Sequence, residues 1–199
     1  MVKAAYSLGT PIYGVAQGNA VTIVDETVDL KNVANKIIRS KTFDFEISYS
    51  TENACVVQEG IYDEFVKAME AEGGYLVKPE EKEKLQNAIW HEIIAQTPEV
   101  IAKEAKIELP EGKTFFMVEE TGIGEDYPFS GEKPSVITTL FKYGEFKEAI
   151  DKVNAITVYH GSIHSCGIHT NDEERVLQLA LNIKTSCLMV RQPQCLGNS

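Results

Sequence analysis

Apolar and polar positions along the chain switch between a helical spacing and short apolar runs typical of buried strands. Residues 29–42 predict a helix, because an acidic N-cap precedes apolar residues at positions 30, 33, 37 and 38. Residues 53–58 predict a buried strand, and residues 61–72 predict the helix that follows it. The same reasoning predicts further strands over residues 12–16, 20–25, 75–77, 114–119, 136–143, 165–170 and 188–190, and further helices over residues 79 to about 94, from 98, 146–154 and 172–183.

Alternation of strands and helices predicts the fold class. Strands separated by single helices are typical of a mostly parallel sheet, so we expect an α/β protein with a three-layer α/β/α sandwich. Ligands of such sheets bind beyond the carboxyl ends of the strands, and we therefore expect the chemistry in loops that follow strands. A chain of 199 residues suits one well-buried core.

Composition narrows the classes of partner. The net charge of −11 repels phosphates and anionic lipids, so we expect no nucleic acid and no membrane as partner. No apolar run approaches the roughly 20 residues that cross a bilayer, and no secretion signal opens the chain, so a cytoplasmic protein is expected. The four cysteines form no CxxC pair, which favours free thiols.

Two groups of residues suggest chemistry on their own. His160, His164, Cys166 and His169 are metal-ligand types within a short stretch, but strand alternation points His169 away from the others. We therefore favour packed polar residues over a metal site. Glu46 lies among apolar residues, where burial would raise its pKa toward that of a useful base; a solvated loop carboxylate is the alternative.

Two adjoining motifs carry a family resemblance. The run Ser40-Lys-Thr-Phe-Asp44, followed by Ser50-Thr-Glu-Asn-Ala54, resembles the nucleophile segment of CoA-acylating aldehyde dehydrogenases, a group that includes sulfoacetaldehyde dehydrogenase and the front half of bifunctional aldehyde-alcohol dehydrogenases. Further matching segments cover essentially the whole chain: residues 1–7, 122–125, 131–133, 161, 164–170 and 192–194. The resemblance implies the fold of an aldehyde-dehydrogenase catalytic domain.

The resemblance places Tyr49 where the family has its nucleophilic cysteine. In the family that cysteine attacks the aldehyde, hydride passes to NAD, and CoA takes the acyl group from the resulting thioester. A phenol, with a pKa of about 10, is a poor substitute for a thiolate. We therefore expect the parent reaction to be lost.

The resemblance also implies a division of the chain. Residues 1–25 would be a remnant of the cofactor domain and the crossover from it, and residues 26–199 a catalytic domain truncated at its carboxyl terminus. Glu132 matches the glutamate that holds the nicotinamide ribose. Because the strands that cradle NAD would be missing, we expect Glu132 to be idle and no cofactor, neither NAD nor CoA, to be used.

Departures from the family pattern gather in segments that line its catalytic cleft: residues 12–17, 20–24, 45–49, 134–138, 160–163 and 187–188. This clustering favours an engineered scaffold with a remodelled small-molecule pocket, or a general-base site with Glu46 or His160 as base and Tyr49 as hydrogen-bond donor. His164 is a further candidate catalytic residue. The alternatives are changes that merely cover newly exposed surface, a natural fragment with residual or partner-dependent function, and residual thiol chemistry at Cys166 or Cys187. An exposed sheet edge would also allow a homodimer.

Overall fold

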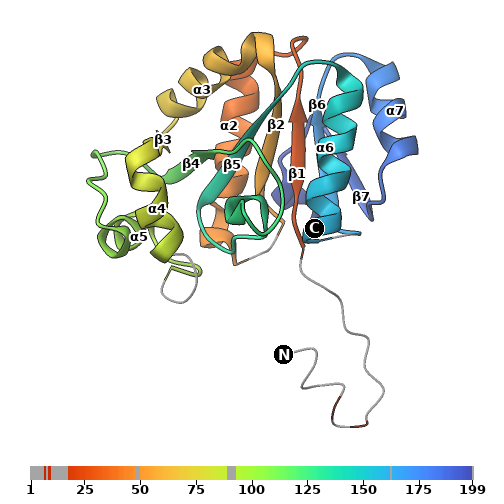
Figure 1. Cartoon of the computed structure of the whole chain (residues 1–199). Helices are drawn as coiled ribbons and strands as arrows, with labels where there is room; N and C mark the ends of the chain where they lie inside the picture. The colour runs from red at the N-terminus through yellow and green to blue at the C-terminus, as the bar shows by residue number, and fades with distance from the viewer. Residues whose placement is uncertain are drawn as a thin grey trace.

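The computed structural model describes residues 7, 9, 18–47, 50–88, 93–161 and 163–198. These residues form a single parallel sheet of seven strands in the order β3-β4-β5-β2-β1-β6-β7. The strands are β1 (Val21–Val24), β2 (Ala54–Gln58), β3 (Gly74–Leu76), β4 (Phe115–Glu119), β5 (Ile137–Tyr143), β6 (Ser165–His169) and β7 (Cys187–Val190). Figure 1 shows the strands side by side, with their amino ends toward the bottom of the view. The predicted α/β class with a parallel sheet is confirmed.

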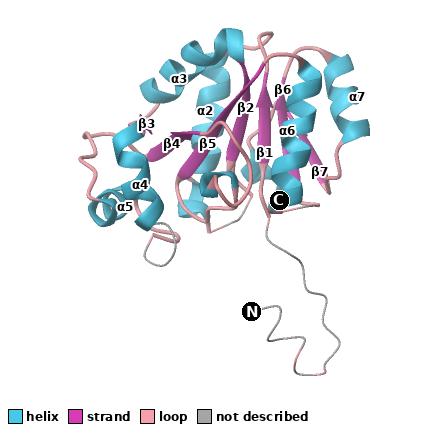
Figure 2. Cartoon of the chain, in the orientation of Figure 1, coloured by secondary structure: helices cyan, strands magenta, loops and turns pink. Residues whose placement is uncertain are grey.

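Helices cover both faces of the sheet, as Figure 2 shows. On one face, α2 (Leu30–Lys41) and α3 (Tyr62–Ala71) pack in a cluster with Cys55 and Val57 of β2. On the other, α6 (Phe146–Tyr159) and α7 (Glu173–Asn182) pack with Ala54 and Val56. Alternate residues of β2 thus enter different cores, which explains why its sequence is apolar at successive positions.

Local signals account for most helix boundaries. The side chain of Asp29 accepts hydrogen bonds from the backbone of Lys31 and Asn32 and begins α2, and Asp172 begins α7 in the same way. Pro98 opens the short helix α5 (Pro98–Ala105). No described helix is long and apolar enough to cross a membrane.

Two helices differ in length from the prediction. The helix α4 (Pro79–Ala88) does not reach residue 94, because Ile93 is buried outside it and Ala95 donates a backbone hydrogen bond to Pro134. The helix α6 extends past Asn154 to Tyr159, because Ile156 packs in the core.

Two predicted elements of the N-terminal region have different outcomes. The strand predicted at residues 12–16 lies outside the described residues. The strand β1, which falls within the predicted remnant 1–25, is hydrogen-bonded on both sides, to β2 and to β6. The division of the chain at residue 25 stays a prediction.

Candidate functional site at the amino-terminal edge of the sheet

The predicted site residues lie at the edge of the sheet where the strands begin. Residues 43–53 precede β2, Glu132 precedes β5, and residues 160–164 precede β6. These candidate residues therefore do not lie in the loops after strands where we expect chemistry, and that expectation stays a prediction. The reason is topological: each helix of a parallel β-α-β unit returns the chain to the amino edge, and these segments follow or precede such returns.

Two buried asparagines tie these loops together. Asn53 Nδ2 donates to Asn19 Oδ1 at 2.6 Å and to the Gly131 carbonyl at 3.0 Å, and Asn19 Nδ2 donates to the Ser130 carbonyl at 2.9 Å. The backbone N–H of Lys133 donates to Asn53 Oδ1 at 3.2 Å. The segments before β1, β2 and β5 are thereby held in one arrangement. Sequence reasoning missed both asparagines, because their partners lie far away along the chain.

Glu46 occupies an internal ion pair. Its Oε2 lies 2.8 Å from Lys41 Nζ and also accepts the hydroxyl of Thr51, and both charged side chains are buried. Burial raises the pKa of Glu46, and the Lys41 ammonium opposes that rise. Glu46 thus links Lys41, at the end of α2, to Thr51, which precedes β2.

Backbone strain marks the same segment. Asp44, Phe45 and Glu46 all have positive φ, at 49°, 49° and 72°. Residues other than glycine seldom adopt this left-handed region, and a run of them costs about 1 kcal/mol or more per residue. Such strain persists where surrounding contacts fix it, as the ion pair of Glu46 does here, and it is most common at functional sites.

Lys133 is a further buried cation that sequence reasoning missed. Its Nζ donates to the carbonyls of Phe129 and Gly131 at 2.7 and 2.8 Å. Burial lowers the pKa of Lys133 well below its usual range, and the nearby Lys41 charge adds to the effect. Both hydrogen bonds fix the loop that carries Glu132.

Glu132 is half-buried and accepts a hydrogen bond from the backbone of Gly18. Burial raises its pKa. A carboxylate in this position is suited to accept hydrogen bonds from ribose hydroxyls, which fits the role implied by the family resemblance. NAD, if bound, would supply hydride acceptance, and Glu132 would orient its ribose.

The rings of the two candidate histidines pack against glycines of neighbouring loops, His160 against Gly131 and His164 against Gly18. A side chain added at Gly131 would lie 2.6 Å from His160 Nδ1, and one added at Gly18 would lie 2.4 Å from the His164 ring. His160 stacks on Tyr159 with ring centroids 4.2 Å apart, and its Nδ1 has no partner among the described residues. Burial lowers the pKa of both histidines, which favours the neutral form that a general base needs.

Tyr49 lies outside the described residues. Of the described residues nearest to it, Ile47 is half-exposed and Ser50 is buried. The structure thus brings Glu132, His160 and His164 to one edge of the sheet and places Glu46 in the interior.

The thiols of Cys55 and Cys166 are poorly placed for chemistry. Cys55 and Cys166 are buried, and burial raises the pKa of Cys166 to about 12. Cys187 is partly exposed but lies on β7, where its sulfur contacts Met189. Within the described residues no group of three or more histidines, cysteines and acids is arranged to hold a metal ion.

Glu52 is a second buried acid missed by sequence reasoning. Its Oε1 accepts the backbone N–H of Gln194 at 2.9 Å, while its Oε2 has no partner among the described residues. Burial raises its pKa to about 7, although a hydrogen bond from Ser40 opposes the rise. Through its hydrogen bond with Gln194, Glu52 links the segment before β2 to the C-terminal turn at residues 194–198.

We expect this acid to make stability depend on pH. The pKa of Glu52 in the folded chain is about 7, above its ordinary value of 4.5, so folding takes up a proton at pH values between the two. The stabilisation is therefore complete below about pH 4.5 and lost as the pH rises through about 7. Urea unfolding should show the free energy of unfolding falling by up to about 3 kcal/mol between pH 5 and pH 8. Glu52→Gln should flatten this slope, and equal slopes for variant and parent would contradict the assignment.

Comparison with known proteins gives matches over the whole chain. No protein-family model matches. The chain is 41% identical to sulfoacetaldehyde dehydrogenase (acylating) of Bilophila wadsworthia, over 100% of this chain and 45% of that protein. It is 31% identical to the bifunctional aldehyde-alcohol dehydrogenase of Escherichia coli K12, over 99% of this chain and 23% of that protein.

Solved structures agree with these matches. An acetylating aldehyde dehydrogenase from Geobacillus thermoglucosidasius superposes with a TM-score of 0.92 at 33% identity, over 98% of this chain and 45% of that one. A probable aldehyde dehydrogenase from Listeria monocytogenes superposes with a TM-score of 0.93 at 28% identity. The chain thus spans less than half the length of the relatives it matches. By sequence along its whole length and by fold, it belongs with the acylating aldehyde dehydrogenases, to one part of which it corresponds.

Proposed function

We propose that the chain binds a small carbonyl compound at the amino-terminal edge of its sheet without forming a thioester at residue 49. The observation that supports this most directly is the meeting of His160, His164 and the Glu132 loop at one edge of the sheet. The relatives are named as acylating aldehyde dehydrogenases, so their substrates are carbonyl compounds. In this chain a phenol replaces the thiol that such acylation requires.

A neutral histidine is the base that best suits this edge. Glu46 is engaged by Lys41 and Thr51 in the interior, whereas His160 and His164 are only partly buried. In the proposed site a histidine accepts a proton from a bound water or from the carbon beside the carbonyl, and Tyr49 donates a hydrogen bond to the carbonyl oxygen. Ester hydrolysis and proton abstraction are therefore the reactions to test. The clustered replacements favour a remodelled pocket, and identities of 31–41% are equally compatible with a natural chain.

The first test is the parent reaction. Purified protein given short aldehydes, NAD and CoA is expected to produce no NADH, because no thioester forms at residue 49. NADH production above that of a heat-denatured sample would refute the proposal.

The second test restores a thiol. Tyr49→Cys should release p-nitrophenolate in a burst from p-nitrophenyl acetate and gain one acetyl group by intact mass, because a thiolate attacks the ester and expels the phenolate. Tyr49→Phe is the matched control and should do neither. A variant thiol that reacts no faster than a free cysteine would show that residue 49 does not face an acyl-binding pocket.

An assembly-dependent function is a second candidate, favoured by the sheet edge at β7. This strand stands last in the sheet, pairs with β6, and is only partly buried. Its outer backbone groups are a template for a strand of a second copy. Light scattering during gel filtration at micromolar concentration should then give the mass of a dimer; a monomer across the whole range would exclude this homodimer.

A further inference from the structure

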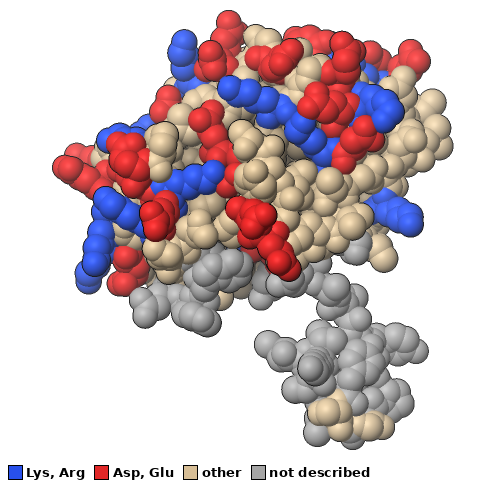
Figure 3. Space-filling model, in the orientation of Figure 1, with Lys and Arg blue, Asp and Glu red and all other residues tan. Residues whose placement is uncertain are grey.

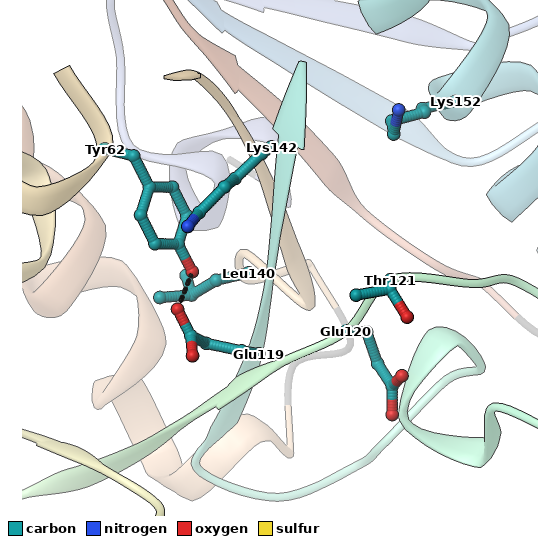
Figure 4. Close-up of a pocket in the computed structure, with 7 residues that line it drawn as sticks. All are labelled: Tyr62, Glu119, Glu120, Thr121, Leu140, Lys142 and Lys152. Atoms are coloured by element: carbon teal, nitrogen blue, oxygen red, sulfur yellow. Dashed lines mark hydrogen bonds between the residues drawn. The ribbon is translucent and has the colours of Figure 1, made fainter. Parts of the chain in front are cut away.

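A pocket of about 270 Å³ lies at the opposite end of the sheet from the candidate site. Its lining comes from the end of β4 (Glu119) and the two residues after it, from β5 (Leu140 and Lys142), and from the start of α3 (Tyr62) and the middle of α6 (Lys152). Figure 4 shows these side chains around the carboxyl ends of the two strands. Nothing in the proposed function uses this space.

The pocket lies at a switch in the winding of the sheet. The strands β2 and β5 are neighbours, but the chain leaves β2 into α3 on one face and leaves β5 into α6 on the other. The two following helices therefore diverge and leave a crevice at the carboxyl ends of the strands. This is the position where open parallel sheets bind small ligands.

Two of its four charged side chains are already neutralised. Glu120 pairs with Lys82 at 2.6 Å, and Lys152 pairs with Glu148 on its own helix. Figure 3 shows the same interleaving of basic and acidic residues over the upper part of this face.

The other two charges have no partner of opposite sign among the described residues. Glu119 and Lys142 are both exposed to solvent, and the Glu119 carboxylate accepts the hydroxyl of Tyr62 at 2.8 Å. The Lys142 ammonium lies 4.2 Å from the centroid of the Tyr62 ring, a contact with the aromatic face and not with a carboxylate. The Tyr62 side chain thus holds one unpaired anion and one unpaired cation apart in the same pocket, over the apolar side chain of Leu140.

We propose that this pocket binds a small zwitterion, an amino acid whose carboxylate pairs with Lys142 and whose ammonium pairs with Glu119. A ligand with both charges can form a charge-assisted hydrogen bond with each of the two side chains, whereas a singly charged ligand can form only one. The volume of about 270 Å³ admits a chain of several carbon atoms between the two groups. The proposal is independent of the candidate site, since Asn53, Glu132 and the two histidines lie at the other edge of the sheet.

The test is a titration of the full chain with ω-amino acids of increasing length: glycine, β-alanine, 4-aminobutyrate and 5-aminopentanoate. Butyrate and butylamine serve as the singly charged halves. Calorimetry gives the dissociation constants, and backbone amide shifts locate the site. One of the amino acids should bind about tenfold or more tightly than either half and shift the amides of Tyr62, Glu119 and Lys142.

Variants distinguish binding at this pocket from an effect of the net charge of the protein. Lys142→Met and Glu119→Gln should each weaken binding about tenfold or more, because each removes one charged partner. Lys67→Met, on the exposed surface of the same helix as Tyr62, is the matched control and should bind as the parent does. Equal binding of butyrate and 4-aminobutyrate, no binding of any probe at about 50 mM, or equal losses in Lys67→Met and Lys142→Met would each overturn the proposal.

Discussion

Replacing Gly161 by alanine is expected to destabilise the protein by about 4 kcal/mol or more. Gly161 has a φ of +94°, and a Cβ there would lie 2.2 Å from the backbone nitrogen of Asn19. The loop it would strike cannot move aside cheaply, because Asn19 is buried and hydrogen-bonded to Asn53 and to Ser130. Urea unfolding of the purified variant measures the loss.

Gly112→Ala is the control for this substitution. Gly112 also has a positive φ, +82°, but an added Cβ would meet no atom within 4 Å. Its cost is therefore the backbone strain alone, about 1 kcal/mol. If both variants lost the same stability, the close approach of residues 19 and 161 would not be present in solution.

Replacing Lys41 by methionine is expected to cost about 3–5 kcal/mol. The substitution leaves the Glu46 carboxylate buried without its cation, and only the hydroxyl of Thr51 still donates to it. The loss should shrink at low pH, because protonation of Glu46 removes the uncompensated charge. The double variant Lys41→Met/Glu46→Leu should recover most of the stability, since a buried ion pair and a well-packed apolar pair are often nearly equivalent.

Lys147→Met is the control for charge removal alone. Lys147 and Asp151 form an ion pair of 2.6 Å with side chains 84% and 61% exposed, so its loss should cost at most about 0.5 kcal/mol. Chemical unfolding at neutral pH compares the two. Equal costs for Lys41→Met and Lys147→Met would mean that the pair of Lys41 and Glu46 is solvated.

Local sequence signals were sufficient for most of the fold. The helix predicted over residues 29–42 is confirmed, because its cap at Asp29 and its apolar face are both encoded within twelve residues. The parallel sheet, which the alternation of strands and helices predicted, is also confirmed. The predicted end of α4 was wrong, because Ile93 is buried outside the helix and Ala95 donates a hydrogen bond to Pro134, about forty residues away, which no local pattern records.

The candidate site was less accessible to sequence reasoning. The resemblance located Tyr49, Glu132 and His164 along the chain, but their roles stay predictions. The polar network of Asn19, Asn53 and Lys133 depends on contacts between residues up to 111 positions apart. One signal in the sequence could have located the site. Residues 43–47 follow a predicted helix, and in a parallel sheet the segment between a helix and the next strand lies at the amino edge.

The strand β2 sets the separation between the two ends of the molecule. Asn53 stands before its first residue and Tyr62 lies beyond its last, and five residues of extended chain span about 17 Å. Over such a distance the energetic effects of substitutions usually sum without cross-talk. Chemistry installed at residue 49 and ligand preference altered at Lys142 can therefore be varied one at a time, which makes this small domain a suitable framework for carrying two unrelated specificities on one polypeptide.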